Sequence, residues 1–195
     1  DTPLNEVTHD YRPGSPERKK VEEAYKKMFQ SKIEVPLYLG DEEVFTKETR
    51  PIRPPHDHQH IVGTYSVAQP AHVKRAIDNS LKAKKKWAAM SWERRVSTFI
   101  KAADLIAGPY RAIINAGTMI GQSKNIFQAE IDATCESVDF LKFNAAFASQ
   151  IYQQQPAPGN GVFNRIEHRP LEGFTYAVTP FNFTAIACNL TSCMA

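Results

Sequence analysis

Apolar residues recur at helical spacing in several stretches of this chain, with charged residues between them. The first stretch opens with Ser15-Pro16-Glu17, which combines an N-cap residue, a proline suited to the first helical position and a first-turn acid, and it predicts a helix over residues 16–29. Most of its residues are charged, so we expect it to form a solvated arm. Three further predicted helices cover a segment opened by Pro70, residues 91–107 before Gly108, and residues 110–120 before Gly121.

The longest helical pattern covers residues 123–152. This segment contains neither Gly nor Pro, and its apolar side chains fall on more than one side of a helix. It therefore predicts one long, largely buried helix. The run QQQPAPGNG that follows, residues 153–161, is predicted to be a linker because its prolines and glycines interrupt regular structure.

Two short apolar runs near the start of the chain predict a hairpin. Val35–Leu39 and Val44–Thr46 flank the run GDEE at residues 40–43, which supplies a turn that contains Gly. A third strand is predicted over His60–Ala68, after a loop at residues 50–59.

Two more strands are predicted near the end of the chain. Residues 162–168 alternate between apolar and polar, and Phe174–Val178 is apolar enough for a buried parallel strand. The run TPFNFTAI then follows at residues 179–186. A buried strand that leads through a short loop into a helix is the unit on which doubly wound parallel sheets bind cofactors, so the predicted fold class is α/β. Neither a G-x-G-x-x-G motif nor a P-loop is present.

Composition indicates an ordinary soluble globular protein. Hydrophobic residues make up 42% of the 195 residues and charged residues 23%, with a net charge of +3, so no nucleic-acid partner is expected. No apolar run approaches the roughly 20 residues that span a bilayer, so no membrane partner is expected either. The three cysteines, Cys135, Cys188 and Cys193, form no C-x-x-C motif and are odd in number, which favours a reducing compartment over a disulfide framework.

Two motifs suggest binding sites but have simpler interpretations. The histidines of the run HDHQH, residues 56–60, alternate along the chain, which separates neighbouring ligands on a strand, and no Cys or Glu completes a tetrahedral set. We therefore expect a solvated loop and no metal. The lysines of the run KAKKKW, residues 82–87, are expected on the solvated face of a helix.

The residues around the last predicted strand carry a family resemblance. LEGFTYAVTPFNFTAI, residues 171–186, closely resembles the first nucleotide-fold strand and loop of aldehyde dehydrogenases, where a P-[WF]-N-[FY] core is characteristic. The chain looks most like the glutamate-semialdehyde (1-pyrroline-5-carboxylate) dehydrogenase branch, and this similarity runs from about residue 15 to residue 190. It is clearest in the runs GDEEV at residues 40–44, FIKAAD at residues 99–104 and QAEIDA at residues 128–133.

The resemblance implies an incomplete amino-terminal part of the aldehyde dehydrogenase fold. Residues 1–34 correspond to an arm with a helix, and residues 35–152 to strands and helices of the NAD-binding domain. Residues 153–170 correspond to the linker and a strand of the oligomerisation flap, which implies a homo-oligomer for the full-length parent. Residues 171–195 correspond to the first nucleotide-fold strand and the start of its helix, where a doubly wound parallel sheet begins.

The resemblance also implies functional residues. In the family, an Asn at the position of Asn182 donates its side-chain amide to the oxyanion that forms when a thiolate adds to the aldehyde. The amide suits this role because it donates without titrating. The same resemblance implies cofactor contacts for Thr179, Pro180 and Phe181 with NAD, and substrate contacts for Phe183 and for Glu130.

The residues themselves leave alternatives to these roles. Asn182 also suits the N-cap of a helix that begins at the next residue. Glu130 is equally consistent with a solvated or paired carboxylate on a helix, and Thr179 with the end of a strand.

The family places its catalytic Cys and Glu well beyond residue 195, so residues 1–195 alone are expected to be inactive. Cys188 and Cys193 have no nearby His and are not expected to be the nucleophile. Two functions follow from this. The first is NAD-dependent oxidation of L-glutamate 5-semialdehyde to L-glutamate in proline breakdown, in the mitochondrial matrix of a eukaryote or otherwise in the cytoplasm. The second is a short non-catalytic product that acts only as an assembly module through its flap strand at residues 162–169.

Overall fold

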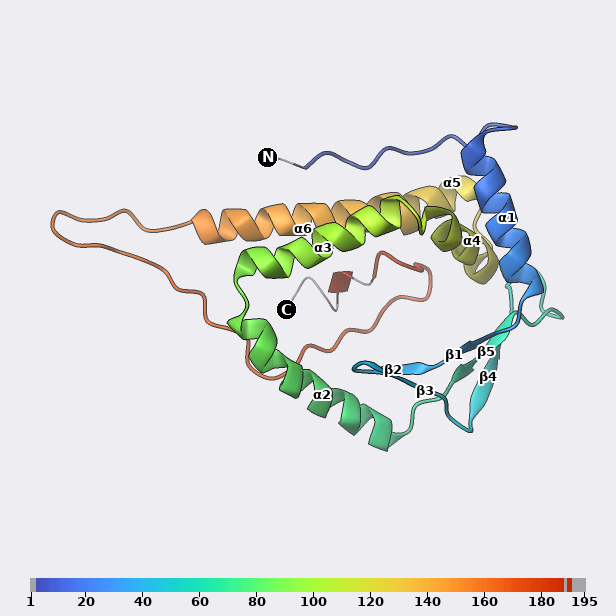
Figure 1. Ribbon diagram of the computed structural model, residues 1–195, viewed down its shortest axis with the longest axis horizontal. Coiled ribbons are helices and arrows are strands. Elements are labelled where there is room, and N and C mark those ends of the chain that lie inside the picture. The colour runs from blue at the N-terminus through green and yellow to red at the C-terminus, as the bar shows by residue number, and fades with distance from the viewer. Residues whose placement is uncertain (1–2, 188, 191–195) are drawn as a thin grey trace.

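The computed structural model describes residues 3–187 and 189–190, and it has the mixed α/β character that the sequence predicts (Figure 1). Helices make up most of its regular secondary structure: α1 (Pro16–Gln30), α2 (Pro70–Ala89), α3 (Trp92–Ala107), α4 (Arg111–Gln122), α5 (Ile126–Ala129), the π-helix η1 (Glu130–Cys135) and α6 (Glu136–Gln153). The strands are short: β1 (Ile33–Val35), β2 (Leu37–Leu39), β3 (Glu42–Val44), β4 (Thr49–Ile52) and β5 (Gly63–Ser66).

The predicted helix starts near Ser15 and Ser91 are confirmed, and each has a side-chain cap. The Ser15 hydroxyl accepts a hydrogen bond from the N–H of Arg18 at 3.2 Å, and Ser91 accepts one from the N–H of Arg94 at 3.4 Å. The predicted end of α4 is wrong. This helix continues past Gly121, and its C-cap residue is Ser123, whose φ of 55° places it in the left-handed region.

The long helical segment after Ser123 is confirmed, with two corrections. It begins at Ile126, because Asn125 and Gln128 form a capping box that fixes the start of the first turn. It is also not a uniform α-helix, because α5 passes into the wider π-turn of η1 before α6 continues.

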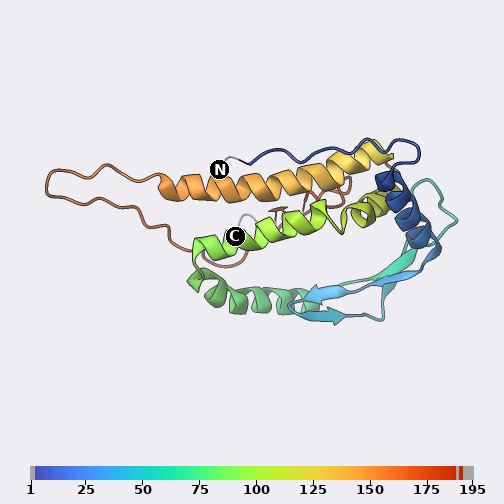
Figure 2. The same cartoon turned by 45° about the horizontal axis from the view of Figure 1, so that its top comes forward.

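Helix pairs hold the apolar core. Helices α3 and α6 lie side by side and antiparallel in both views, with Ala103, Val138 and Leu141 buried between them (Figures 1 and 2). Helix α1 packs on α4, where Val21 and Ala116 are buried. The prediction of a solvated arm is therefore wrong for this face of α1, because a few apolar residues among many charges are enough to form a packing stripe.

The small sheet contains a pairing that the sequence did not predict. Its order is β1-β5-β4, with β1 and β5 parallel and β4 antiparallel to β5. A Cβ on Gly63 would lie 2.2 Å from the carbonyl oxygen of Ile33, so only glycine permits this close approach of β1 and β5. Strand β4 (Thr49–Ile52) overlaps the start of the predicted loop at residues 50–59, where Pro51 weakens the strand pattern, and its edge position tolerates that proline.

The predicted hairpin is confirmed but has a tighter turn. Strands β2 and β3 pair antiparallel, with Leu39 opposite Glu42. The turn is therefore Gly40-Asp41 alone, with Gly40 at φ 71°, and Glu42 and Glu43 belong to the second strand. The predicted strand over His60–Ala68 is confirmed only at its centre, in β5.

Neither strand predicted near the end of the chain is formed. Residues 163–180, all of which the structure describes, adopt no helix or strand, and Val162 takes part only in an isolated bridge with Gly159. The expected start of a doubly wound parallel sheet is therefore not present. A parallel strand is held by backbone hydrogen bonds to neighbouring strands, and no other segment within the described residues pairs with residues 174–178.

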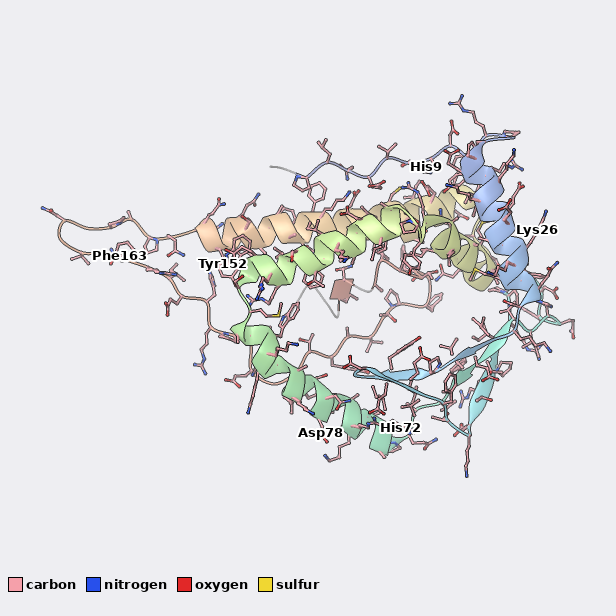
Figure 3. The ribbon with its side chains drawn as sticks, in the orientation of Figure 1. His9, Lys26, His72, Asp78, Tyr152 and Phe163 are labelled. Carbon is pink, nitrogen blue, oxygen red and sulfur yellow. The ribbon has the colours of Figure 1, made fainter. Side chains whose placement is uncertain are left out.

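Residues 154–169 instead form a protruding loop beyond the end of α6 (Figure 1). Tyr152, at the base of this loop, stacks on Trp92 with ring centroids 5.3 Å apart and meets His168 edge to face at 5.2 Å. Its hydroxyl accepts a hydrogen bond from Arg95 at 3.0 Å. Figure 3 shows Tyr152 at the end of α6 and Phe163 on the loop, so the base of the loop is fixed while its apolar tip faces solvent.

We expect Leu141→Ala to lower the free energy of unfolding by about 2–5 kcal/mol, because it removes apolar contacts between α3 and α6 and leaves a cavity. Urea denaturation followed by circular dichroism measures this. Phe140→Ala, one residue earlier and 43% exposed, is the matched control and should cost less. Equal losses for the two variants would contradict the assigned core.

Candidate functional site

The loop that contains Asn182 lies against the junction between α4 and α5. Lys124 Nζ donates to the carbonyl oxygen of Asn182 at 2.7 Å and lies 4.5 Å from the centroid of the Phe183 ring. Lys124 Nζ also donates to Asp132 Oδ2 at 2.6 Å, and both of these side chains are largely buried. A lysine held by a carboxylate of η1 thus fixes the carbonyl side of the loop.

Gln122, the last residue of α4, binds the same loop in either orientation of its amide. In one orientation, its Nε2 donates to the carbonyl oxygen of Phe181 at 3.3 Å. In the orientation that satisfies both atoms of the amide, Nε2 donates to the carbonyl oxygen of Asn182 at 3.1 Å. Oε1 then accepts from the N–H groups of Phe183 and Thr184, both at 3.1 Å, and from the Thr184 hydroxyl at 3.2 Å.

These contacts bear on the N-cap alternative for Asn182. Residues 183–187 form bends and a turn and no helix. In the orientation of Gln122 that satisfies its amide, the N–H of Thr184, one of the groups that a cap at Asn182 would bind, donates to Gln122 instead. Asn182 itself is exposed, and its side-chain amide has no hydrogen-bond partner among the described residues. Its amide donors are therefore open to an incoming acceptor.

The other residues predicted in this loop differ in their surroundings. Thr179, Pro180 and Phe181 are exposed, and Phe181 is 96% exposed. Phe183 is half-buried beneath Lys124. The structure thus brings these residues together on one loop, and no strand precedes Thr179.

Glu130 lies in a different environment, within a fully buried polar network. Its Oε1 accepts from the backbone N–H of His9 at 2.8 Å and from Arg111 Nε at 3.1 Å. Arg111 Nη2 also donates to Oε1, so two nitrogens of the guanidinium take part in the ion pair. Its Oε2 accepts from the Tyr11 hydroxyl at 2.6 Å and from Asn115 Nδ2 at 2.7 Å. The carboxylate therefore faces hydrogen-bond donors on both of its oxygens, as in the paired-carboxylate alternative.

The same network fastens the amino-terminal segment to the helices. Arg111 donates to Glu6 Oε1 at 2.9 Å and to the Val7 carbonyl oxygen at 2.6 Å. On α6, Asp139 accepts from the Glu6 N–H and from Asn5 Nδ2, both at 2.7 Å. Figures 1 and 2 show this segment running along α6, and Figure 3 labels His9 on it.

The network sets the protonation states of its members. Burial by itself raises the pKa of Glu130, but hydrogen bonds from Arg111, Tyr11 and the His9 N–H outweigh it, so the pKa lies below its usual range. Burial, together with the hydrogen bond to Glu130, raises the pKa of Tyr11 well above its usual value. Burial and the Glu130 charge raise the pKa of Cys135, which disfavours its thiolate. Glu130 is therefore a permanently charged anchor near neutral pH, and Cys135 is poorly suited to be a nucleophile.

The remaining motifs have structural partners. His56 contacts the hydroxyls of Ser123 at 2.7 Å and Tyr25 at 3.3 Å, and His60 Nε2 lies 2.6 Å from the Phe29 carbonyl oxygen. Across the described part of the chain, no group of three His, Cys, Asp or Glu side chains has a geometry that could hold a metal ion. Among the same residues, no helix combines the length and the apolarity needed to cross a membrane. Cys188 and Cys193 lie outside the described residues.

The sequence interpretation missed Gln122, Lys124, Asp132 and Arg111. A signal for Arg111 was present, because Arg111, Asn115 and Thr118 form a polar stripe at helical spacing on an otherwise apolar helix, and all three are buried. For Gln122 and Lys124 there was no such signal. Polar residues at a helix end usually face solvent, and only the contact with residues 182–184 makes these two part of a site.

Comparison with known proteins links this arrangement to a family. The sequence model of the aldehyde dehydrogenase family matches residues 44–195. The probable delta-1-pyrroline-5-carboxylate dehydrogenase of Schizosaccharomyces pombe is 45% identical over 190 residues, which cover 96% of this chain and 35% of that protein. The mitochondrial delta-1-pyrroline-5-carboxylate dehydrogenase of Dictyostelium discoideum is 41% identical over 196 residues, which cover 100% of this chain and 35% of that protein.

Solved structures give the same result. The delta-pyrroline-5-carboxylate dehydrogenase from Mycobacterium tuberculosis bound with NAD superposes with a TM-score of 0.95 at 46% sequence identity, and the match covers 97% of this chain and 36% of that one. The chain thus spans about a third of the length of the proteins that it resembles.

We expect Arg111→Met to lower the free energy of unfolding by roughly 3–5 kcal/mol, because it leaves the buried Glu130 carboxylate without its cation. Arg94→Met, at an exposed position on α3, should change it by less than about 0.5 kcal/mol. Chemical denaturation of both variants tests this, and a loss below about 1 kcal/mol for Arg111→Met would argue against the ion pair.

The lowered pKa of Glu130 also predicts a pH dependence. Its stabilising contribution is fully present above the unfolded-state pKa of about 4.3 and is lost as pH falls through the lower folded-state value. The difference in unfolding free energy between the wild-type chain and Glu130→Gln should therefore narrow from pH 6 toward about pH 3. Glu23→Gln, at an exposed position on α1, serves as the control. A difference that stays constant over this range would contradict the assignment.

Proposed function

Because this chain belongs to the aldehyde dehydrogenase family, we propose that it is part of an NAD-dependent enzyme that oxidises L-glutamate 5-semialdehyde (1-pyrroline-5-carboxylate) to L-glutamate in proline breakdown. Two delta-1-pyrroline-5-carboxylate dehydrogenases are 45% and 41% identical over nearly the whole chain, and one solved relative is bound with NAD. Since the chain spans only about a third of these proteins, the activity belongs to the full-length protein that carries this sequence. Its cellular site would be the mitochondrial matrix in a eukaryote, as the names of several relatives indicate, or otherwise the cytoplasm.

The observation that carries this proposal is the open amide of Asn182 on a loop whose backbone is held in place. When a thiolate adds to the aldehyde carbonyl, the oxygen becomes an oxyanion, and a preorganised amide N–H stabilises it without moving. The thiolate and the group that activates water would come from a Cys and a Glu outside residues 1–195. Bound NAD would accept the hydride.

The neighbours of Asn182 would shape the site. Thr179, Pro180 and Phe181 are exposed on the same loop and would lie along NAD. Phe183, half-buried beneath Lys124, would form part of the wall of the aldehyde tunnel. For Glu130, the buried contacts support the paired-carboxylate interpretation, in which it organises the helices behind the site and does not contact the substrate.

A second candidate function is assembly. The tip of the protruding loop carries exposed apolar side chains, with Val162 at 57% exposure, Phe163 at 80% and Ile166 at 47%. These side chains suit a protein partner, and in a full-length dehydrogenase that partner would be a second copy of the chain. If the reading frame stops directly after codon 195, this assembly role is the only one of the two that the product could have, whereas a downstream segment with a catalytic Cys supports the enzyme.

We expect Asn182→Ala in the full-length protein to lower kcat by about 10²–10³ while the Kd for NAD stays nearly unchanged, because the lost donor acts on the transition state. Stopped-flow detection of NADH measures kcat, and fluorescence titration measures NAD binding. Asn160→Ala, on the exposed turn of the protruding loop, is the control and should retain full activity. An unchanged kcat for Asn182→Ala would refute the oxyanion role.

A further inference from the structure

We propose that Gln122 and Lys124 are positioning residues for Asn182, and that they act through hydrogen bonds to the carbonyl oxygen and the N–H of the peptide unit between Asn182 and Phe183. This inference rests on the proposed oxyanion role of Asn182. Neither residue would touch the substrate or NAD. Their effect on the reaction would come only from the direction in which they hold the Asn182 side chain.

These hydrogen bonds can restrain the peptide unit because of the geometry of a trans peptide. The carbonyl oxygen of Asn182 and the N–H of Phe183 belong to one planar peptide unit, and in a trans peptide they point to opposite sides. Lys124 Nζ donates to the carbonyl oxygen at 2.7 Å. In the orientation of the Gln122 amide that satisfies both of its polar atoms, Gln122 Oε1 accepts from the N–H at 3.1 Å. With both ends of the unit held, rotation about ψ of Asn182 is restricted, and this torsion helps to set the direction of the Asn182 Cα–Cβ bond.

Gln122 and Lys124 are themselves held in place by the helices. Gln122 ends α4, and its Oε1 also accepts from the N–H and hydroxyl of Thr184, so it holds the turn beyond the peptide unit as well. Lys124 is held by Asp132 of η1 at 2.6 Å, with side-chain exposures of only 16% for Lys124 and 27% for Asp132. A largely desolvated ion pair loses less to solvent screening than an exposed one, so the position of Nζ is well defined.

This arrangement explains why an exposed, irregular loop can carry a preorganised donor. Residues 179–182 are exposed and form no helix or strand, so the loop contributes little rigidity of its own. Catalytic donors must be held within about 0.5 Å of their productive position. The helix junction supplies this rigidity, and Lys124 also covers the ring of Phe183.

The first test is amide hydrogen exchange at Phe183 and Thr184 in the full-length protein. Gln122→Met keeps the length of the side chain and removes the acceptor, so both amides should exchange about fivefold to tenfold faster. Gln153→Met, near the end of α6 and away from these residues, is the control. Unchanged exchange in Gln122→Met would overturn the proposal.

The second test is the split between kcat and binding in the same protein. Gln122→Met and Lys124→Met should each lower kcat about fivefold or more with little change in the Kd for NAD, and Lys124→Arg, which keeps the cation, should recover most of the loss seen in Lys124→Met. Lys74→Met removes a lysine that pairs with Asp78 on α2 and should have no effect. A fall in kcat that comes with a fall in the free energy of unfolding, and that Lys124→Arg does not reverse, would show a merely structural role and overturn the proposal.

The two tests separate this inference from the proposed function. If Asn182→Ala lowers kcat but Gln122→Met and Lys124→Met do not, the oxyanion role stands and the positioning role is overturned. If Asn182→Ala leaves kcat unchanged, the oxyanion role fails and the positioning role fails with it, although the enzyme activity itself is then still present. The exchange measurement would still report whether Gln122 holds the loop.

Discussion

The buried ion pair between Glu130 and Arg111 is the interaction on which the rest of this structure depends. Two charges removed from water are tolerated only when both are paired and hydrogen-bonded, and here the remaining positions are filled from elsewhere in the chain. The backbone of the amino-terminal segment supplies two of these partners, at His9 and Val7. One ion pair therefore joins α4, η1 and a segment more than a hundred residues away in sequence.

The π-helix η1 connects this buried network to the proposed site. Glu130 and Asp132 lie two residues apart on it, and their carboxylates bind different partners: Glu130 binds Arg111, and Asp132 binds Lys124. Single π-turns inside α-helices are frequent at functional sites, because they change which residues face a given direction. The same short element thus holds the beginning of the chain and, through Lys124, the loop that carries Asn182.

The apolar segment at residues 174–178 has the composition of a strand but does not form one. Tyr176 is 80% exposed and Val178 is 72% exposed, although the sequence here has the composition of a buried strand. Strand propensity reflects packing against neighbours more than a preference of the backbone itself. The composition of residues 174–178 therefore indicates a strand, but only neighbouring strands can impose that conformation.

The sequence by itself determined the helices, because their signals are local. Ser15 caps the helix that it was predicted to cap, a second predicted helix begins next to Ser91, and the hairpin followed from Gly40 in its turn. The motif around Asn182 also identified the family, because a residue order typical of a family does not depend on the fold of the chain around it.

Only the tertiary structure decided which residues support the site. Three contacts between residues that are separated in sequence show this: the parallel pairing of β1 with β5, the ion pair of Glu130 with Arg111, and the hydrogen bond from the Phe183 N–H to Gln122. No periodicity or cap encodes such contacts, because each depends on where the rest of the chain returns in space. The physical reason is that a polar side chain has the same local sequence whether it faces water or another segment, and burial alone distinguishes the two.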